Sequence, residues 1–381
     1  MNTARSYNTG FGIQSNTTAN GGGYPSASNT VKTENYDGTT WTNKPDSSNT
    51  RWATDSGFGT SGSQGGVSGA LSNSLANVSA TEEYNSSINT ITSAAWASGG
   101  NANTARRQLG YTGAGTQNAF QVFGGFSPGG FLNNSESYNG TSWTATPNLN
   151  STRGQLSGFG TTAAAVACGG NPTADTTTEE WNGSSWTSVT GMSSGRYEHG
   201  GAGTLTAGLA IMGDFGPPNP VGSACEEYDG TTWTSGGTSN TGRRELGGTG
   251  SQTAALVGGG NPAPGVAGNT ESYDGTSWSE VNNLVNERGS NHTMGGLNGQ
   301  SSSITTGGSS PSATSTTEIW NGTNWVTSAS MAGNRFAHSA GGTSASGLVG
   351  LGDQPTPTML VSTEEFTGET SAATASTLTT S

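Results

Sequence analysis

The chain has 381 residues, 64 of them glycine, and a formal net charge of −13. Only 10% of its residues are charged, against about a quarter in most globular domains. Basic patches are absent, which argues against nucleic acid and anionic membranes as partners. No apolar run approaches the roughly 18 residues of a membrane span, and residues 1–5 lack the apolar core of a signal peptide.

A nine-residue motif recurs along the chain and reads TESYDGTSW at 270–278. An aromatic residue ends one strand, Asp-Gly or Asn-Gly follows, and a tryptophan begins the next strand. These dipeptides favour a type I′ turn, in which both central residues have positive φ. The motif therefore predicts a repeated β-hairpin. Further copies lie at 33–41, 135–143, 178–186, 225–233 and 317–325, and two copies without the tryptophan lie at 81–84 and 363–366.

Two further markers precede each hairpin. A short polar run ends in an arginine, and these arginines recur at intervals of 43 to 55 residues. A glycine-rich segment follows, and then a small apolar strand that ends in Gly-Gly, as at 163–170 and 254–260. The longest interval is explained by an insertion at 85–95, which displaces Trp96. The unit is therefore four short strands.

Residue size rises along each unit, from Gly, Ala and Ser in the first strand to Tyr and Trp in the last. This gradient predicts a wedge whose first strand is innermost, as in a β-propeller of four-stranded blades. A linear solenoid is the alternative. The sequence shows 31 of the 32 strands that eight blades need, and we favour eight over seven. We expect a single propeller over 1–369, with units starting near 4, 50, 105, 152, 195, 242, 287 and 334, and a Ser/Thr/Ala-rich tail over 370–381 that completes the last blade or hangs free.

With Arg, Gly-Gly, Tyr and Trp in successive strands, the chain resembles the kelch family of β-propellers from about residue 2 to 368. The NTAR run at 103–106 and the motif at 270–278 are similar to kelch-like repeat proteins of marine tailed bacteriophages. The resemblance implies a virion or tail-fibre role, although a fold does not fix a function.

Each third strand carries a Glu two residues before its aromatic, on the same strand face. Buried carboxylates need partners, and one arginine per unit is available at the same end of the wedge. We expect structural ion pairs among Arg153, Arg196, Arg243, Arg288, Arg335, Glu136, Glu179, Glu226, Glu271 and Glu318. A catalytic or anion-binding arginine ring is the alternative.

The three histidines, His199, His292 and His338, lie three or four residues after a repeat arginine. Sister units carry leucine three residues after the arginine, so we favour a packing role over a metal site. Cys168 and Cys225 occupy different repeat positions and are expected to be free thiols. No catalytic motif stands out. The expectation is a protein without catalytic residues, metal or cofactor.

The loops on one face vary from blade to blade and hold all thirteen prolines, whereas the opposite face repeats nearly the same turns. Variable loops on a rigid scaffold commonly carry recognition, although proline also simply stiffens exposed loops. The candidate binding residues are Tyr24, Phe126, Phe131, Phe215, Pro217, Pro218, Pro262, Pro355 and Met359.

The expected function is recognition of other virion proteins, or of a host-surface protein or glycan, by a virion-associated propeller made in the host cytoplasm. Homo-oligomers are compatible with this role. A secreted or cell-surface glycan-binding module is the alternative, which would require an export signal. A propeller enzyme is the third possibility, which would require a converging polar cluster on one face.

Overall fold

The computed structural model is all-β, as predicted. Its described residues form strands and no helix, and therefore no helix that could cross a membrane. It describes residues 1–2, 8–13, 16–21, 31–48, 56–61, 64–71, 77–85, 89–218, 221–262, 264–289, 293–295, 299–309, 312–355, 358–373 and 377–380.

The repeat folds into four-stranded antiparallel sheets, which confirms the predicted blade. In one of them β16 (Ser157–Gly160), β17 (Ala165–Cys168), β18 (Thr178–Trp181) and β19 (Trp186–Val189) pair in this order. Trp181 lies opposite Trp186 across the last pair of strands. Eight such sheets occur among the described residues, the number counted from the repeats.

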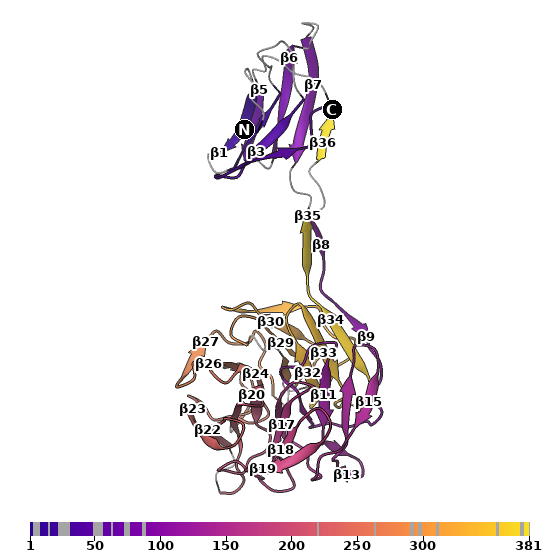
Figure 1. The fold of residues 1–381 in the computed structure, drawn as a ribbon, viewed down its shortest axis with the longest axis vertical. Coiled ribbons are helices and arrows are strands. Elements are labelled where there is room, and N and C mark those ends of the chain that lie inside the picture. Colours follow the sequence, from indigo (N-terminus) through magenta and orange to yellow (C-terminus); the bar gives the residue numbers. More distant parts are fainter. Residues whose placement is uncertain are drawn as a thin grey trace. The chain divides into compact units, whose positions relative to one another are not determined.

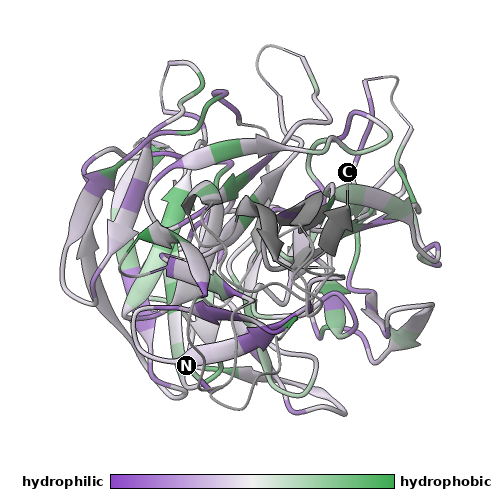
Figure 2. Cartoon of the chain, turned by 90° about the horizontal axis from the view of Figure 1, so that it is seen from above, coloured by the Kyte–Doolittle hydropathy of each residue, from purple (hydrophilic) through white to green (hydrophobic). Residues whose placement is uncertain are grey.

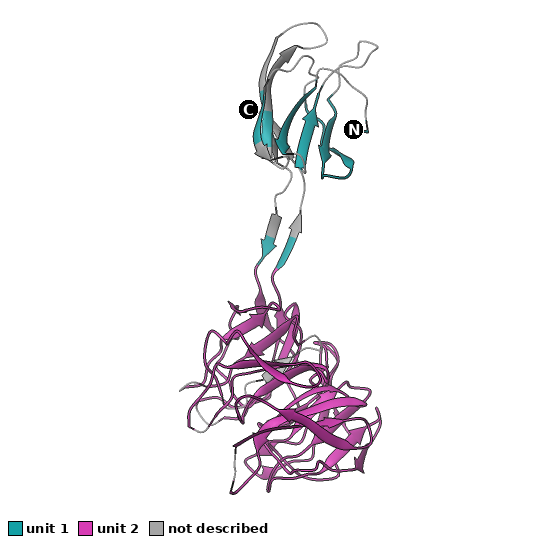
Figure 3. Ribbon diagram, turned by 90° about the vertical axis from the view of Figure 1, so that its left-hand side faces the viewer, with its two compact units in different colours: residues 1–92, 370–381 teal, residues 93–369 magenta. Residues whose placement is uncertain are grey.

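The eight sheets are divided between two compact units, in contrast to the single domain expected over 1–369 (Figure 3). The larger unit is residues 93–369 and holds six sheets. The smaller unit combines residues 1–92 with 370–381 and holds the other two. The chain therefore passes from one unit to the other twice, after Thr92 and after Glu369.

The larger unit is a ring of six blades, and not the ring of eight blades that the repeat count favoured (Figure 1). Its inner strands adjoin one another in the order β10, β16, β20, β24, β28 and β32, and β32 adjoins β10. The sheets besides that of β16 are, from inner to outer strand, β10 (Gly110–Tyr111), β11 (Phe120–Phe123), β14 (Ser135–Tyr138) and β15 (Trp143–Thr146); β20 (Gly200–Thr204), β21 (Ala207–Asp214), β22 (Val221–Tyr228) and β23 (Trp233–Thr238); β24 (Gly247–Ser251), β25 (Ala254–Gly258), β26 (Thr270–Tyr273) and β27 (Trp278–Val281); β28 (Thr293–Gly295), β29 (Ser303–Thr306), β30 (Thr317–Trp320) and β31 (Trp325–Ser328); and β32 (Ser339–Gly342), β33 (Ser346–Gly350), β34 (Thr363–Thr367) and β9 (Ala95–Ser98).

The last blade takes its outer strand from the beginning of the larger unit. Strand β9 pairs with β34, and Trp96 lies opposite Phe366 with ring centroids 5.1 Å apart. Trp96 is therefore the tryptophan that the copy at 363–366 lacks. It is not a displaced member of the copy at 81–84, as the spacing suggested.

The smaller unit contains two sheets and one ribbon. The sheets are β1 (Thr9–Ile13), β2 (Asn16–Asn20), β3 (Thr33–Tyr36) and β4 (Trp41–Lys44), and β5 (Ser56–Ser61), β6 (Gln64–Leu71), β7 (Asn77–Asn85) and β36 (Thr377–Thr380). Strands β1 and β5 adjoin. The ribbon pairs β8 (Asn89–Thr92) with β35 (Thr370–Ala373). The C-terminal segment thus completes the sheet of β7 and not the last blade.

The hairpin turns between third and fourth strands differ from the predicted type I′ turn. Tyr228 pairs with Trp233, so the loop between them has four residues. Its glycine, Gly230, has a φ of 93°, whereas Asp229 is not among the residues of positive φ. The Asp229 carboxylate instead accepts hydrogen bonds from the N–H groups of Thr231 and Thr232. The Asp is therefore selected for this side-chain-capped turn.

Neighbouring blades are joined by close packing and by indole hydrogen bonds. A Cβ on Gly208 would lie 2.1 Å from the Phe159 ring of the preceding blade, so only glycine fits there. Trp233 donates its indole N–H to Thr178 of that blade at 3.1 Å, and Trp143 donates likewise to Thr363 at 2.8 Å. Hydrophobic residues appear as short stretches spread over many strands (Figure 2).

We expect Trp96→Ala to destabilise the larger unit by about 2–4 kcal/mol, slightly less than the loss of a fully buried tryptophan. The indole contacts Phe366 and donates its N–H to the Ala329 carbonyl at 2.9 Å, but it is only partly buried. Hydrogen exchange of residues 93–369, followed by mass spectrometry, measures the change. Trp41→Ala in the smaller unit is the control. If the Trp96→Ala variant exchanged faster in β5–β7 but at the parent rate in β32–β34, the pairing of β9 with β34 would be contradicted.

Candidate binding site

Each blade of the larger unit contains a buried Arg–Glu ion pair. It lies on the face that carries the loops between second and third strands and between blades, which we call the loop face. The pairs are Arg106–Glu136 (2.8 Å), Arg153–Glu179 (3.0 Å), Arg243–Glu271 (2.6 Å) and Arg335–Glu364 (2.6 Å), with Arg196–Glu226 and Arg288–Glu318. Every residue that we expected in an ion pair therefore has one.

The pair in the fourth blade shows what these residues do. Arg243 donates from one terminal nitrogen to Glu271 and from the other to the carbonyls of Gly259 (2.7 Å) and Asn269 (2.6 Å). The second oxygen of Glu271 accepts the N–H of Asn240 at 2.8 Å. Burial lowers the pKa of Arg243, and the Glu271 charge opposes that shift. The pair thus holds in place the backbone at both ends of the loop between the second and third strands, and the loop that enters the blade.

Two of the histidines, His199 and His338, are buried immediately before the inner strands β20 and β32. His199 Nε2 lies 3.5 Å from Cys168 Sγ, and His338 Nε2 lies 3.0 Å from Thr306 Oγ1. Burial raises the pKa of Cys168 to about 12, so the thiol is protonated at neutral pH and unsuited to nucleophilic attack. His292 lies outside the described residues.

The first pair of candidate aromatic anchors forms a small hairpin on the loop face. Strands β12 (Phe126–Ser127) and β13 (Gly130–Phe131) pair with each other. The two phenyl rings meet edge to face at 5.6 Å, and the Arg107 guanidinium lies 5.4 Å from the Phe126 ring. Both rings are half-buried, so they remain available for contact while being held in place.

The remaining loop-face candidates differ in exposure. Phe215 is half-buried, and the guanidinium of Arg196 lies 4.5 Å from its ring. Pro217 and Pro218 follow it in an exposed turn. Among the other candidates, Pro355 is exposed, Pro262 and Met359 are partly buried, and Tyr24 lies outside the described residues.

A ring of residues around the propeller axis was not predicted. Each occupies the second position after a repeat arginine and has a φ of 52–54°, a left-handed conformation that is uncommon outside glycine. The N–H groups of Gln108, Gln155, Glu198 and Glu245 each donate to the carbonyl of the ring residue in the neighbouring blade, at 2.6 to 2.9 Å. The described members, which we call the axial ring, are Gln108, Gln155, Glu198, Glu245 and Ala337. Their constant position in the sequence, two residues after each repeat arginine, is the signal that could have revealed them.

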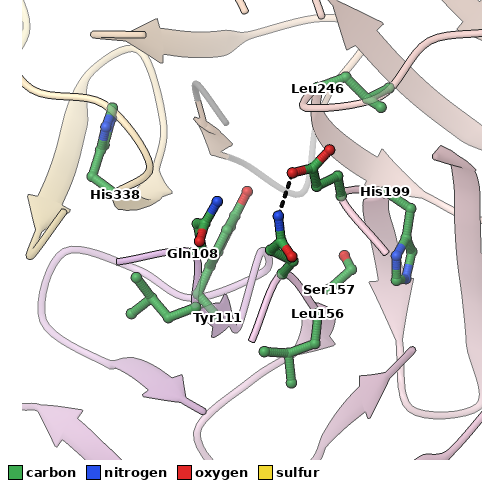
Figure 4. A pocket seen from close by; sticks show the side chains of 10 residues that line it. Gln108, Tyr111, Leu156, Ser157, His199, Leu246 and His338 are labelled. Carbon is green, nitrogen blue, oxygen red and sulfur yellow. Dashed lines mark hydrogen bonds between the residues drawn. The ribbon is translucent and has the colours of Figure 1, made fainter. Parts of the chain in front are cut away.

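The axial ring borders a small polar cavity (Figure 4). Gln155 and Glu198 both line the cavity, and Gln155 donates to Glu198. Asn171 donates to Gln155, and Asn261 donates to Glu245. The cavity leaves about 30 Å³ open to the centres of water molecules, which is room for about two waters. It is therefore too small for a large ligand but matches a small polar group.

The carboxyl group of Glu198 lines this cavity, and its pKa is raised. Burial and the neighbouring Glu245 charge raise its pKa to about 7, while Arg244 acts in the opposite direction. One carboxylate oxygen has no hydrogen-bond donor among the described residues, and its nearest cation is Arg244 Nε at 3.8 Å. Arg244 itself lies closer to Asp214, at 2.6 Å. Within the described part of the chain, no three His, Cys, Asp or Glu side chains could hold a metal ion.

We expect Glu271→Ala to lower the free energy of unfolding by about 3–5 kcal/mol, because Arg243 is left buried without its partner. The double variant Arg243→Ala with Glu271→Ala should lose less than the sum of the single changes. Urea denaturation measures all three. Full additivity would contradict the coupling of the two side chains.

Glu198→Gln should stabilise the protein above pH 7. The folded-state pKa of Glu198 is raised from 4.5 to about 7, so its ionisation opposes folding increasingly between pH 4.5 and 7 and fully above pH 7. The gain at pH 8 should be on the order of 1–3 kcal/mol, and it should vanish near pH 4. Thermal unfolding across this pH range measures it. A gain that does not depend on pH would contradict the assignment.

Comparison with known proteins does not identify the site. No protein-family model matches the chain, and no curated protein matches it. The geometry of the loop face and the axial ring therefore carries the functional argument.

Proposed function

We propose that the chain is a non-enzymatic recognition protein of a virion. In this proposal, the loop face of the larger unit binds another virion protein or a host-surface protein or glycan. The observation that carries it is the contrast within this face. The same buried Arg–Glu pair recurs under six blades, while the loops above it differ from blade to blade.

The variable loops are well organised for contact. The Phe126–Phe131 hairpin and the Pro217–Pro218 turn present apolar groups whose backbone is already held. Ordered loops lose less conformational entropy when they bind, and half-buried aromatic rings are common anchors in interfaces. These properties favour recognition over the alternative that the prolines only stiffen exposed loops.

The same face has a polar groove beside the last blade. It has a volume of about 320 Å³, and its lining includes Ser98, Asn101 and Gln354 together with the buried pair Arg335 and Glu364. Amide and hydroxyl groups of this kind can bond to sugar hydroxyls or to a peptide backbone. The groove therefore suits either a glycan or a protein partner.

The virion assignment rests on the resemblance to kelch-like repeat proteins of marine tailed bacteriophages. The absence of a catalytic role is supported by the site itself. Cys168 is held protonated by burial, and the axial cavity accommodates about two waters and not a larger substrate. Binding without chemistry is the function that these features support best.

The test compares two triple-alanine variants in binding to a panel of marine bacterial cells and to a glycan array. The loop-face variant changes Phe126, Phe131 and Phe215. The control changes Thr144, Thr234 and Val326, which are exposed on the outer strands β15, β23 and β31. We expect the loop-face variant to lose at least about tenfold in affinity, as hot-spot anchors do, and the control to bind like the parent.

Thermal unfolding must first show that both variants are folded, because the three phenyl rings are half-buried. Alanine at Pro217 and Pro218, which are exposed, provides a second loop-face variant with less effect on packing. Undiminished binding by the folded loop-face variants, with loss in the outer-strand variant, would assign recognition to the edge of the ring and overturn the proposal.

A further inference from the structure

The last blade of the larger unit differs from the other blades in the loop that leads into its inner strand. Three blades carry an asparagine three residues before the repeat arginine, at Asn103, Asn150 and Asn240, whereas the last blade carries Ala332. At the next position the other five blades carry a hydroxyl or amide side chain, and the last blade carries Gly333. Two adjacent side chains are therefore shortened at one place on the loop face.

In two of the blades that have it, this asparagine covers the glutamate of the ion pair. The backbone N–H and the side-chain amide of Asn240 both donate to one oxygen of Glu271, at 2.8 and 3.1 Å. Asn103 makes the same two hydrogen bonds to Glu136, at 2.7 and 2.8 Å. This carboxylate oxygen therefore accepts a second donor when one is within reach.

The last blade keeps the backbone hydrogen bond but has no side chain to add the second one. The N–H of Ala332 donates to one oxygen of Glu364 at 2.7 Å, and Arg335 donates to the other at 2.6 Å. Of the six glutamates in the buried pairs, Glu364 has the most exposed side chain, at 8%. The acceptor that Asn240 covers in the fourth blade is therefore accessible in the last blade.

The shortened side chains border the polar groove beside the last blade. Its lining includes Glu364, Ser98 and Gln354, and Ser98 lies opposite Glu364 in the strand register. A Cβ on Gly333 would meet one described atom within 4 Å outside its chain neighbours, which is Gln354 Nε2 at 3.7 Å. The side-chain amide of Gln354 makes no hydrogen bond to a described residue, so it is available to a ligand. The groove thus combines an accessible acceptor with an available amide.

The size, charge and hydrogen-bonding groups of the groove indicate a neutral saccharide. Its volume of about 320 Å³ lies at the lower end of small-molecule sites, which span about 300–1,000 Å³. Arg335 and Glu364 are the charged residues of its described lining and neutralise each other, so an ionic ligand is not selected. Hydroxyl groups both donate and accept, which suits a carboxylate beside an amide. The described lining has no aromatic or large aliphatic side chain of the kind that anchors a protein partner.

We propose that this groove binds one pyranose ring of a neutral glycan. One sugar hydroxyl donates to Glu364, in the place that the Asn240 amide takes in the fourth blade, and Gln354 donates to another hydroxyl. This inference rests on the recognition role proposed for the loop face, and it names the class of ligand for one part of that face.

The experiment is a saturation-transfer NMR titration of the full chain with the methyl glycosides of glucose, galactose, mannose and N-acetylglucosamine. Cyclohexanol has a ring of similar size with one hydroxyl and is the control. N-acetyl-asparagine methylamide represents the side chain of a protein partner. We expect at least one glycoside to bind with a Kd on the order of millimolar, as a small ligand held by few hydrogen bonds does. Cyclohexanol and the asparagine derivative should bind at least tenfold more weakly.

Ala332→Asn restores the residue of three other blades and should weaken glycoside binding at least tenfold, because the new amide covers Glu364. Ser193→Asn places the same residue at the equivalent, exposed position of the third blade and should leave binding unchanged. Gln354→Ala, which leaves the loop before Arg335 untouched, should weaken binding at least threefold. Thermal unfolding checks that all three variants are folded.

The proposal is overturned if none of the four glycosides binds, or if the parent, Ala332→Asn and Gln354→Ala bind them equally. It is also overturned if the asparagine derivative binds more tightly than every glycoside and loses its binding in Ala332→Asn, since the groove would then take a protein side chain. The variant lacking Phe126, Phe131 and Phe215 tests the proposed function independently. If that variant loses binding to cells while no glycoside binds the groove, the recognition role stands and only the saccharide site fails.

Discussion

The buried pairing of one arginine with one glutamate in every blade is the constraint on which the larger unit depends. A guanidinium away from water is unfavourable unless it is paired and hydrogen-bonded. Each arginine here pairs with the glutamate of the third strand and donates to a carbonyl at the entry to that strand. Five of the six also donate to a carbonyl at the end of the second strand. Arg243, for instance, reaches Gly259, Asn269 and Glu271. Because the same connection recurs six times, the loops above it are free to differ without loosening the ring.

The blade and the ion pairs could be predicted because both are written into every repeat. Period-two alternation places Glu271 on the same strand face as Tyr273, and the need to pair a buried charge then names Arg243. The number of sheets followed from the same count, but the eight-bladed ring did not, because two of the eight sheets belong to the smaller unit. The turn at Asp229 was misjudged because its Asp-Gly dipeptide also suits a longer loop in which the Asp side chain bonds the backbone.

Features that depend on contacts between distant parts of the chain could not be read from the repeats. Trp96 follows the motif copy at 81–84 in sequence, but it pairs with Phe366 of the copy at 363–366, which lies 270 residues further along the chain. No local pattern shows which of these two copies Trp96 belongs to. The axial ring could not be predicted for another reason. Its members share a backbone conformation but not a residue type, since Gln108, Glu198 and Ala337 all adopt it. Only the assembled ring brings Glu198 and Glu245 together.

The two crossings of the chain between its units have a consequence for biosynthesis. Strand β9 emerges early, yet its partner β34 is made only near the end of the chain, and β7 waits longer still for β36. Strand pairings between residues so distant in sequence form slowly, and until they form the edges of these strands stay unpaired. The four central blades, from β16 to β31, can assemble on the ribosome as their strands appear. The sheets that contain β9 and β7 are completed only after nearly the whole protein has been translated. Strand β9 therefore spends most of synthesis without a partner, and the sheet of β5–β7 spends it with an open edge.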